Sequence, residues 1–334
     1  MSKVILHIGT HKTGSTSLQN SFWTNSDLLA GQGVHYPRLP GSTGHHGMVL
    51  DWAGRPDSYA LPQGALGTLG ALAEQHAQQD HILFLSSEEF ARDDALQRMV
   101  DIRDTLAAFD DIQVVCVLRT QWEFLQSVYL EVSKIQNPGE PEHLVTEVLE
   151  TGAHNGLWFD YNRLLDRLEE VFLPEQIQLL DFDSCRRKEG GVVGAVLDLI
   201  GAPLHVHQLK PVDGGWSNPS PMALAGWAAN VLYAPYAAPS WLVSLATDVL
   251  RSEFGSKVQT CLFTRKEFYA LKTHFQSRNA ELVQRRSALQ PEFDLTPVRA
   301  DQLTLFRDDI TQMFWVHLGR RLLEDHSSEA EMSS

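Results

Sequence analysis

The chain contains few cysteines, and their spacing excludes two classes of cysteine-stabilised protein. Only three occur in 334 residues, at Cys116, Cys185 and Cys261. An odd and widely spaced set predicts neither a disulfide framework nor a cysteine-based metal site. An apolar strand pattern begins by residue 4, so we expect no signal peptide ahead of the fold. Both observations favour a cytoplasmic protein.

Long apolar runs and positive charge are also scarce. No run reaches the roughly 18 to 20 residues that a membrane-spanning helix needs, so no membrane span is expected. There are 27 lysines and arginines against 42 acidic residues, a formal net charge of −15. This charge argues against nucleic acid or an acidic membrane surface as the main partner. An anionic ligand would therefore depend on a few local cations.

What the chain does contain is a pattern of short buried strands. Hydrophobic residues make up 43% of the sequence, enough for a large core. Apolar runs at residues 4–8, 82–85, 114–118 and 177–182 predict strands, and helical patterns lie between them. Continuous apolar strands separated by helices are typical of a parallel sheet covered on both faces. The sequence therefore predicts a three-layer α/β fold with a central parallel sheet.

The later part of the chain is predicted to be mostly helical. Strand patterns end near Pro211, and helical patterns follow at residues 266–286 and 301–323. We expect one domain over residues 1–324, in which residues 211–324 pack on the sheet or form a lid. The polar residues 325–334 are predicted to be a disordered tail. Residues 31–70, rich in glycine and proline, are expected to form a long irregular excursion of the kind that is commonly functional.

The most informative segment joins the first strand to the first helix, and it has the sequence Gly9-Thr10-His11-Lys12-Thr13-Gly14-Ser15-Thr16. Such a turn directs backbone N–H groups and a helix N-terminus at one point, which favours a phosphate. The usual nucleoside triphosphate loop places its lysine directly after the second glycine. Here Lys12 comes two residues before Gly14. The alternative is an ordinary connection, with Ser15 or Thr16 as the N-cap and Lys12 in solvent.

A second segment places a cation at another strand end. Arg119 directly follows the predicted strand 114–118, and Ser127 lies eight residues later on a predicted helix. An arginine can bind a phosphate through two parallel charge-assisted hydrogen bonds. Ligands of parallel sheets bind at the carboxyl ends of the strands. The alternative is a surface arginine with an unrelated helical serine.

Together, these two segments resemble the PAPS-dependent sulfotransferases (PAPS is 3′-phosphoadenosine 5′-phosphosulfate), in particular the soluble bacterial type. Looser likenesses lie at residues 33–37, 85–90 and 182–201. The resemblance implies a fold of the P-loop nucleotide-binding type. It also implies in-line transfer of a sulfuryl group from PAPS to an acceptor hydroxyl on a carbohydrate, glycolipid or small metabolite. No metal is implied, no metal-ligand spacing is visible, and the oligomeric state is not indicated.

The resemblance also implies roles for individual residues. Lys12 would contact the bridging oxygen that becomes the leaving group. The 5′-phosphosulfate would be bound by the N–H groups of residues 13–16 (Thr13, Gly14, Ser15 and Thr16) and by the hydroxyls of Ser15 and Thr16. Arg119 and Ser127 would bind the 3′-phosphate. His11 would either border the donor or simply pack.

A general base must accept the proton of the acceptor. In the family it is a glutamate or histidine near the end of the second strand or in the loop that follows. The candidates are His46 and Glu88, followed by His35 and His45, because an imidazole titrates near neutral pH and Glu88 follows a strand. Each of them has a structural alternative. His7, within the first strand, is expected to be buried and structural.

Two other functions are considered. A nucleotide kinase or nucleoside triphosphate hydrolase of P-loop type would have lysine directly after the second glycine and an aspartate at a strand end for magnesium. Ser15 and Arg119 stand at those positions. A catalytically inactive nucleotide-binding protein would have no need of Lys12.

Some candidates stay undecided at the level of sequence. Three tryptophans of the later part could stack on a sugar or ring of the acceptor, but we expect them in the core: Trp216, Trp227 and Trp241. No motif identifies a third phosphate contact among Lys210, Arg265 and Lys266.

Overall fold

A computed structural model describes residues 1–53, 57–212, 222–295, 302 and 305–332 of the chain. The chain divides into two compact units, and each is described here by itself. The first comprises Met1–Thr120, Thr151–Ser217 and Gln276–Thr296, and the second comprises Gln121–Glu150, Asn218–Phe275 and Pro297–Ser334. The single domain expected over residues 1–324 stays a prediction.

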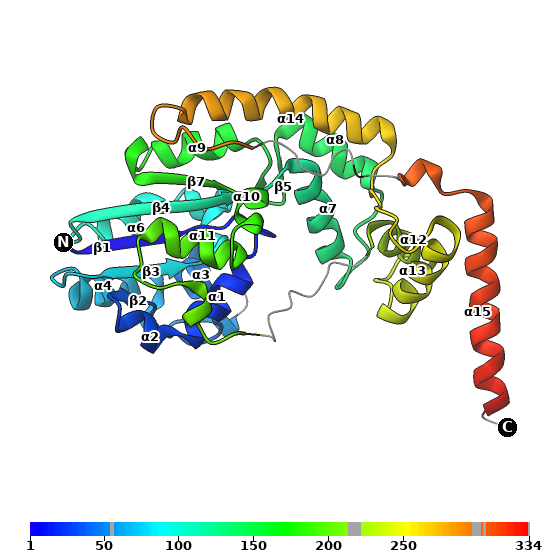
Figure 1. The fold of residues 1–334 in the computed structure, drawn as a ribbon, viewed down its shortest axis with the longest axis horizontal. Helices are drawn as coiled ribbons and strands as arrows, with labels where there is room; N and C mark the ends of the chain where they lie inside the picture. The colour runs from blue at the N-terminus through cyan, green and yellow to red at the C-terminus, as the bar shows by residue number, and fades with distance from the viewer. Residues whose placement is uncertain (54–56, 213–221, 296–301, 303–304, 333–334) are drawn as a thin grey trace. The chain divides into compact units, whose positions relative to one another are not determined.

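A five-stranded, fully parallel sheet forms the centre of the first unit (Figure 1). Its strand order is β2-β3-β1-β4-β7. The strands are β1 (Lys3–His7), β2 (Val34–His35), β3 (Ile82–Ser86), β4 (Asp111–Leu118) and β7 (Ile177–Asp181). The four predicted strands are present. The two residues of β2 are too few to give a strand pattern in the sequence, so β2 was not expected.

Side chains of the central strands alternate between two apolar layers, as the pleat of a strand requires. In β1, Val4 and Leu6 join one core cluster and Ile5 joins the other. The Ile5 face is covered by α1 (Ser15–Thr24), α2 (Ser26–Ala30), α10 (Phe182–Arg187) and α11 (Gly191–Ile200). The opposite face is covered by α3 (Leu50–Ala53), α4 (Gly64–His76), α5 (Asp93–Leu96), α6 (Met99–Thr105), α9 (Tyr161–Glu169) and the last part of α14 (Arg265–Arg286). The predicted three-layer α/β fold is confirmed.

Buried arginine contacts attach the last part of α14 to this unit. Arg286 is 1% exposed and donates hydrogen bonds to the carbonyls of Pro174 (3.0 Å) and Ile177 (2.6 Å) at the start of β7. Arg278 donates from Nε (3.0 Å) and Nη2 (2.8 Å) to the Asp160 carboxylate, which also caps α9. These contacts satisfy backbone and carboxylate groups that would otherwise be costly to bury.

The excursion predicted at residues 31–70 contains more regular structure than expected. Its described residues include β2, α3, the start of α4, and the short 3₁₀ turns η1 (His46–Val49) and η2 (Asp57–Tyr59). Other short elements of the first unit are η3 (Glu88–Ala91), η4 (Pro174–Gln176), η5 (Val206–Gln208) and the antiparallel pair β5 (Ala153–His154) and β6 (Leu157–Trp158).

The described part of the second unit is helical apart from short turns and one isolated bridge. Its elements are α7 (Gln121–Val132), α8 (Pro141–Thr151), α12 (Ala223–Tyr233), α13 (Ser240–Phe254), the first part of α14, η8 (Arg307–Asp309) and α15 (Gln312–Met332). Leu224, Leu250 and Phe314 lie in its core. The backbone of α15 is helical to Met332, whereas the sequence predicts a disordered tail from residue 325. Within the described residues, no helix combines the length and apolar character that crossing a membrane requires.

Candidate functional site

Three strand ends converge at the carboxyl edge of the sheet, on either side of β1. The chain leaves β1 toward α1 on one face of the sheet. It leaves β3 toward α5 and α6, which cover the opposite face. The chain that follows β4 also returns to the sheet through α9 on that opposite face. The place where neighbouring strand ends lead to helices on opposite faces is the topological switch point of the sheet. Ligands of open α/β sheets bind there, so the residues after β1, β3 and β4 define the candidate site.

The loop after β1 is anchored to β4 and then turns sharply. Backbone hydrogen bonds continue past the strand, from Ile8 N–H to the Val115 carbonyl (2.9 Å) and from Thr10 N–H to the Val117 carbonyl (2.8 Å). Three loop residues then adopt left-handed conformations: Gly9 (φ 93°), Lys12 (φ 60°) and Gly14 (φ 84°). A non-glycine residue in this region is uncommon and typical of a functional constraint. Lys12 is therefore held in an unusual conformation inside the loop.

Gly14, rather than Ser15 or Thr16, is the N-cap of α1, and no side chain caps this helix. Helix geometry leaves the N–H groups of its first turn without a carbonyl of the same helix to bond. They are directed at the loop, where the helix dipole also favours an anion. Ser15 is buried and Thr16 is exposed. The alternative of a simple side-chain cap does not describe this turn.

Two glycines let the loop backbone approach its neighbours closely. A Cβ on Gly9 would lie 2.8 Å from Cβ of Glu88 and 2.9 Å from its Cα. A Cβ on Gly14 would lie 3.2 Å from Val192 Cγ2 of α11. The first contact is closer than side-chain atoms tolerate, so the approach of the loop to Glu88 depends on glycine at position 9.

The Gly9→Ala variant is expected to lose about 2 to 4 kcal/mol of the free energy of unfolding, because the added methyl group meets Glu88 and φ is left-handed. Gly33→Ala is the matched control, since its φ of 80° carries the same strain and nothing lies within 4 Å of the added Cβ. Urea unfolding of both variants measures the difference. Equal losses would show that the close approach to Glu88 has no energetic weight.

Lys12 and Arg119 bring positive charge to two neighbouring strand ends. Both side chains belong to half-buried residues. Arg119 Nη1 donates to the Lys12 carbonyl (3.2 Å), and the Arg119 carbonyl accepts from the Tyr161 hydroxyl (2.5 Å). The Arg119 guanidinium also lies over the Phe182 ring, 5.2 Å from its centroid. Arg119 is thus fixed beside the loop by contacts from three directions.

Other predicted loop residues contribute in different ways. Thr13 is buried, and its hydroxyl donates to the Thr10 carbonyl (2.5 Å), so its side chain braces the loop. His11 is half-buried, and its Nε2 lies 3.3 Å from Oε1 of Glu89. Ser127 is buried on α7. It belongs to the second unit, so its predicted role in binding a 3′-phosphate together with Arg119 stays a prediction.

Glu88 stands directly against the loop at the carboxyl end of β3. Its Oε2 accepts a hydrogen bond from Gln19 Nε2 of α1 (2.8 Å). Burial acts to raise the pKa of Glu88, but the nearby His46 and His11 and the hydrogen bond from Gln19 outweigh it, so the net pKa is lowered. Glu88 is therefore an ionised carboxylate at neutral pH, available as a proton acceptor.

The predicted base candidate His46 lies in the same cluster as Glu88. It begins η1, and its Nδ1 lies 2.8 Å from the Ser87 hydroxyl. That hydroxyl also accepts the Glu89 N–H (3.2 Å) as the cap of η3. His46 is half-buried and acts electrostatically on Glu88. The structure brings Glu88, His46 and His11 together, although 77 residues separate the first and last of them in sequence.

The remaining histidine candidates occupy other positions. Both ring nitrogens of His45 are used: Nε2 donates to the Pro37 carbonyl and Nδ1 accepts the Ser86 N–H, each at 2.8 Å. Burial lowers its pKa to about 4, so His45 is a neutral structural residue. His7 is buried as expected, with Nδ1 2.8 Å from the Ser86 hydroxyl. His35 pairs in register with Leu83, near the amino end of β3 rather than the carboxyl end.

A strand-end aspartate that the sequence analysis did not consider is Asp181, the last residue of β7. Its Oδ2 accepts the Ser184 N–H (2.7 Å) as the cap of α10. Burial raises the pKa of this carboxyl. Asp181 is thus occupied as a helix cap, and the residue that directly follows Gly14 is a serine and not a lysine. Neither feature favours the kinase or hydrolase alternative.

The undecided aromatic and basic residues are also placed within their own units. Trp227 packs edge-to-face on Trp315 at 5.7 Å and against the core of its unit, as expected. Trp241 is 56% exposed, so the expected core position is wrong for this residue. Trp216 lies outside the described residues. Arg265 pairs with Asp309, and the Lys210 backbone bonds to Asn25 (2.7 Å).

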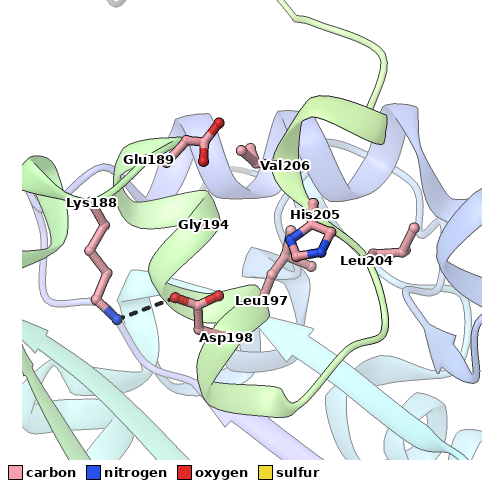
Figure 2. Close-up of a pocket in the computed structure, with 8 residues that line it drawn as sticks. All are labelled: Lys188, Glu189, Gly194, Leu197, Asp198, Leu204, His205 and Val206. Atoms are coloured by element: carbon pink, nitrogen blue, oxygen red, sulfur yellow. Dashed lines mark hydrogen bonds and ion pairs between the residues drawn. The ribbon is translucent and has the colours of Figure 1, made fainter.

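A pocket of about 270 Å³ lies beside α11 and η5, and Figure 2 shows its lining. Lys188 and Asp198 form an ion pair of 3.3 Å across it, and His205 lines another side. Its charges are largely exposed, and its lining includes none of the predicted site residues. We therefore do not assign the donor to this pocket.

Comparisons with known proteins return no matching family model. The search of curated proteins also gives no match. Among solved structures, a sulfotransferase from Alicyclobacillus acidocaldarius is similar at 16% identity and TM-score 0.40, over 68% of this chain and 92% of that one. The sulfotransferase domain of the curacin biosynthetic pathway gives 15% and 0.40, over 84% and 96%. That of the Synechococcus PCC 7002 olefin synthase gives 14% and 0.38, over 81% and 94%. All three are sulfotransferases, the family that the motifs resemble, and similarity of this degree carries no argument about activity.

Proposed function

We propose that the protein transfers a sulfuryl group from PAPS to an acceptor hydroxyl. The observation that carries this proposal is the meeting of Lys12 and Arg119 at the switch point of the sheet, where the Arg119 guanidinium bonds to the Lys12 carbonyl (3.2 Å). One cation follows β1 and the other follows β4. Two cations at adjacent strand ends suit a donor that carries anionic groups at both its 5′ and 3′ positions.

The loop fits the 5′-phosphosulfate of such a donor. Gly14 in a left-handed conformation directs the first N–H groups of α1 toward the loop. The transferred group spreads negative charge over its oxygens, and the leaving phosphate oxygen gains charge as the S–O bond breaks. Fixed N–H groups and Lys12 stabilise that charge without reorganisation during the reaction. Lys12 has the role of stabilising the leaving oxygen, and Arg119 binds the 3′-phosphate, with Ser127 as its proposed partner.

Glu88 is the group best placed to accept the proton of the acceptor. Glu88 is ionised and lies against the loop. A carboxylate directed at the phosphates of the donor would repel them. The arrangement therefore favours Glu88 on the acceptor side of the transferred group. His46 is the second candidate because it belongs to the same cluster.

The acceptor is proposed only as a class: a carbohydrate, a glycolipid or a small metabolite with a free hydroxyl. The reaction as proposed needs no metal, since Lys12, Arg119 and the N–H groups supply the positive charge. We also propose a cytoplasmic location. The three cysteines are all buried free thiols, as a reducing compartment permits.

Thermal unfolding with added nucleotides tests the function. Adenosine 3′,5′-bisphosphate is expected to raise the melting temperature progressively with concentration, because a ligand of the native state stabilises it. AMP, which lacks the 3′-phosphate, is expected to have little effect. A larger shift with ATP and Mg²⁺ than with the bisphosphate would favour a kinase or hydrolase and contradict the proposal.

The same measurement on Arg119→Ala tests the 3′-phosphate contact. The bisphosphate is expected to lose roughly 10- to 100-fold in affinity, because a charge-assisted bidentate contact disappears, while the affinity for AMP changes little. Arg186→Ala is the matched control, since Arg186 also lies over the Phe182 ring (5.5 Å) but pairs with Asp183. If Arg119→Ala kept its discrimination between the two nucleotides, the 3′-phosphate would be bound elsewhere.

A further inference from the structure

Three histidines from separate elements meet near the amino end of β3, away from the candidate active site. His35 is the last residue of β2, His76 is the last residue of α4, and His81 directly precedes β3. The register pairs His35 with Leu83, close to the start of β3, whereas Glu88 follows the end of the same strand. This triad, His35, His76 and His81, has no role in the proposed reaction.

The three imidazoles are close enough to share one ion. Each offers a ring nitrogen, and these three atoms lie within 4.8 Å of one another. His76 Nδ1 and His81 Nε2 are 2.8 Å apart, and the ring centroids of His35 and His81 are 4.0 Å apart. Ligand nitrogens about 2.0 to 2.1 Å from a tetrahedral zinc ion lie roughly 3.4 Å from each other. The shortest distance between triad nitrogens, 2.8 Å, and the upper bound of 4.8 Å lie on either side of this value. Small side-chain rotations would therefore place the three nitrogens around one zinc ion.

The backbone holds the three residues in position. His81 N–H donates to the Gln79 carbonyl (2.9 Å), and the His81 carbonyl accepts the Lys3 N–H (3.1 Å). Ile82 N–H donates to the Gly33 carbonyl (2.9 Å), which joins the starts of β2 and β3. Ligands carried on such rigid elements need little ordering when an ion binds.

The electrostatic setting also suits a cation. An imidazole coordinates a metal ion through the lone pair of a neutral ring nitrogen, and each of the three residues is at least half-buried. His76 lies at the C-terminus of the 13-residue helix α4, where the helix dipole is negative. His76 is buried, but His35 and His81 are only half-buried, which leaves a path for an ion from solvent.

We propose that the triad His35, His76 and His81 binds one divalent transition-metal ion that prefers imidazole ligands, such as Zn²⁺ or Co²⁺, with water in the remaining position. Three neutral imidazoles match the ligand preference of these ions and not that of Mg²⁺ or Ca²⁺. Because the site joins β2, the C-terminus of α4 and the start of β3, its bound ion stabilises this end of the sheet. In sequence, 41 residues separate His35 from His76 and five separate His76 from His81, so their spacing forms no metal-ligand motif.

The competing interpretation is a packed group of neutral histidines that shares one proton between His76 and His81. It accounts for the 2.8 Å contact equally well. It predicts no affinity for metal beyond that of ordinary surface histidines. The two interpretations therefore differ in stoichiometry and in the residues on which binding depends.

Calorimetric titration of the untagged, chelator-treated full chain with ZnCl₂ separates them, with the visible absorption of added CoCl₂ as a second readout. We expect one tight site per chain, a four- or five-coordinate cobalt spectrum, no comparable binding of MgCl₂, and a melting temperature that rises with Zn²⁺. His81→Gln and His35→Gln are each expected to weaken Zn²⁺ binding by more than about 100-fold, since losing even an outer-shell partner costs roughly 10- to 100-fold.

The matched control removes another close pair of histidines. His205 and His207 are exposed and stacked at 5.4 Å, so the double variant His205→Gln/His207→Gln is expected to keep the tight site. The proposal is overturned if the unmodified chain shows no tight site, or if the site survives both triad variants or is lost in the control. The measurement on the unmodified chain does not depend on the folding of any variant.

Discussion

Replacing Lys12 with alanine is expected to lower turnover by about 100- to 1000-fold, the typical cost of removing one group that stabilises developing charge. The affinity for adenosine 3′,5′-bisphosphate is expected to fall only moderately. Lys12 carries positive charge within the loop after β1, and the proposed reaction builds charge on the leaving oxygen only as the S–O bond breaks. An interaction that strengthens in the transition state affects turnover more than ground-state binding.

The experiment measures release of the bisphosphate from PAPS, with a panel of hydroxyl acceptors and without acceptor, beside the dissociation constant of the bisphosphate. Lys188→Ala is the matched control, because this lysine belongs to the same unit and pairs with Asp198 at the surface. It is expected to leave both quantities nearly unchanged. If Lys12→Ala reduced binding and turnover by the same factor, Lys12 would be a simple anion contact and not a leaving-group stabiliser.

The layered fold could be predicted because its strands carry their own pattern. Residues of β1 and β4 are apolar on both faces, and a continuous apolar run of this length is typical of a buried parallel strand. β2 escaped prediction because it has two residues and gains its strand conformation by pairing with β3. The start of α15 was also misplaced: the helical pattern was expected from residue 301, whereas the helix begins at Gln312. Boundaries depend on tertiary contacts and caps that a pattern does not carry.

The candidate site was predictable where its residues are local in sequence. The glycines, hydroxyls and lysine of the loop occupy eight consecutive positions, so their common role follows from one turn. The contacts of Glu88 with Gln19, and its closeness to His46, depend on the parallel pairing of β1 with β3 and on the course of residues 41–49. The sequence offered four base candidates, with His46 and Glu88 ahead of His35 and His45, but it could not show which of them lie beside the loop.

The histidine triad shows the same limit more clearly. His76 and His81 are five residues apart, an interval that suggests nothing by itself, and His35 lies 41 residues before His76. Only the register of β2 on β3 brings His35 to the end of α4. His35 was a candidate base because the base of the sulfotransferase family lies near the end of the second strand or in the loop that follows it. The structure instead places it away from the carboxyl end of β3, among imidazoles.

The identity of the base is expected to appear in the pH dependence of turnover. If Glu88 accepts the proton, Glu88→Gln lowers kcat about 100- to 10,000-fold, the usual contribution of general base catalysis. The pKa of Glu88 is lowered, so the carboxylate stays ionised through the neutral range. The part of the kcat/KM profile that depends on the catalytic base is then flat between about pH 5 and about pH 8. Activity falls only as the pH drops through the lowered pKa, where the carboxylate takes up its proton.

An imidazole base would instead give a kcat/KM that falls within that same interval as the pH decreases. Histidine titrates there and loses its lone pair when it is protonated. Glu89→Gln is the matched control for charge: Glu89 follows Glu88 in η3 but pairs with His11 and Arg92, and its loss is expected to cost less than about 10-fold. His46→Gln completes the comparison. A profile that falls below neutral pH in the unmodified enzyme, together with a larger loss in His46→Gln than in Glu88→Gln, would transfer the role of base to His46. A flat profile with the larger loss in Glu88→Gln would assign the role to the carboxylate, and His46 would then act by keeping that carboxylate ionised.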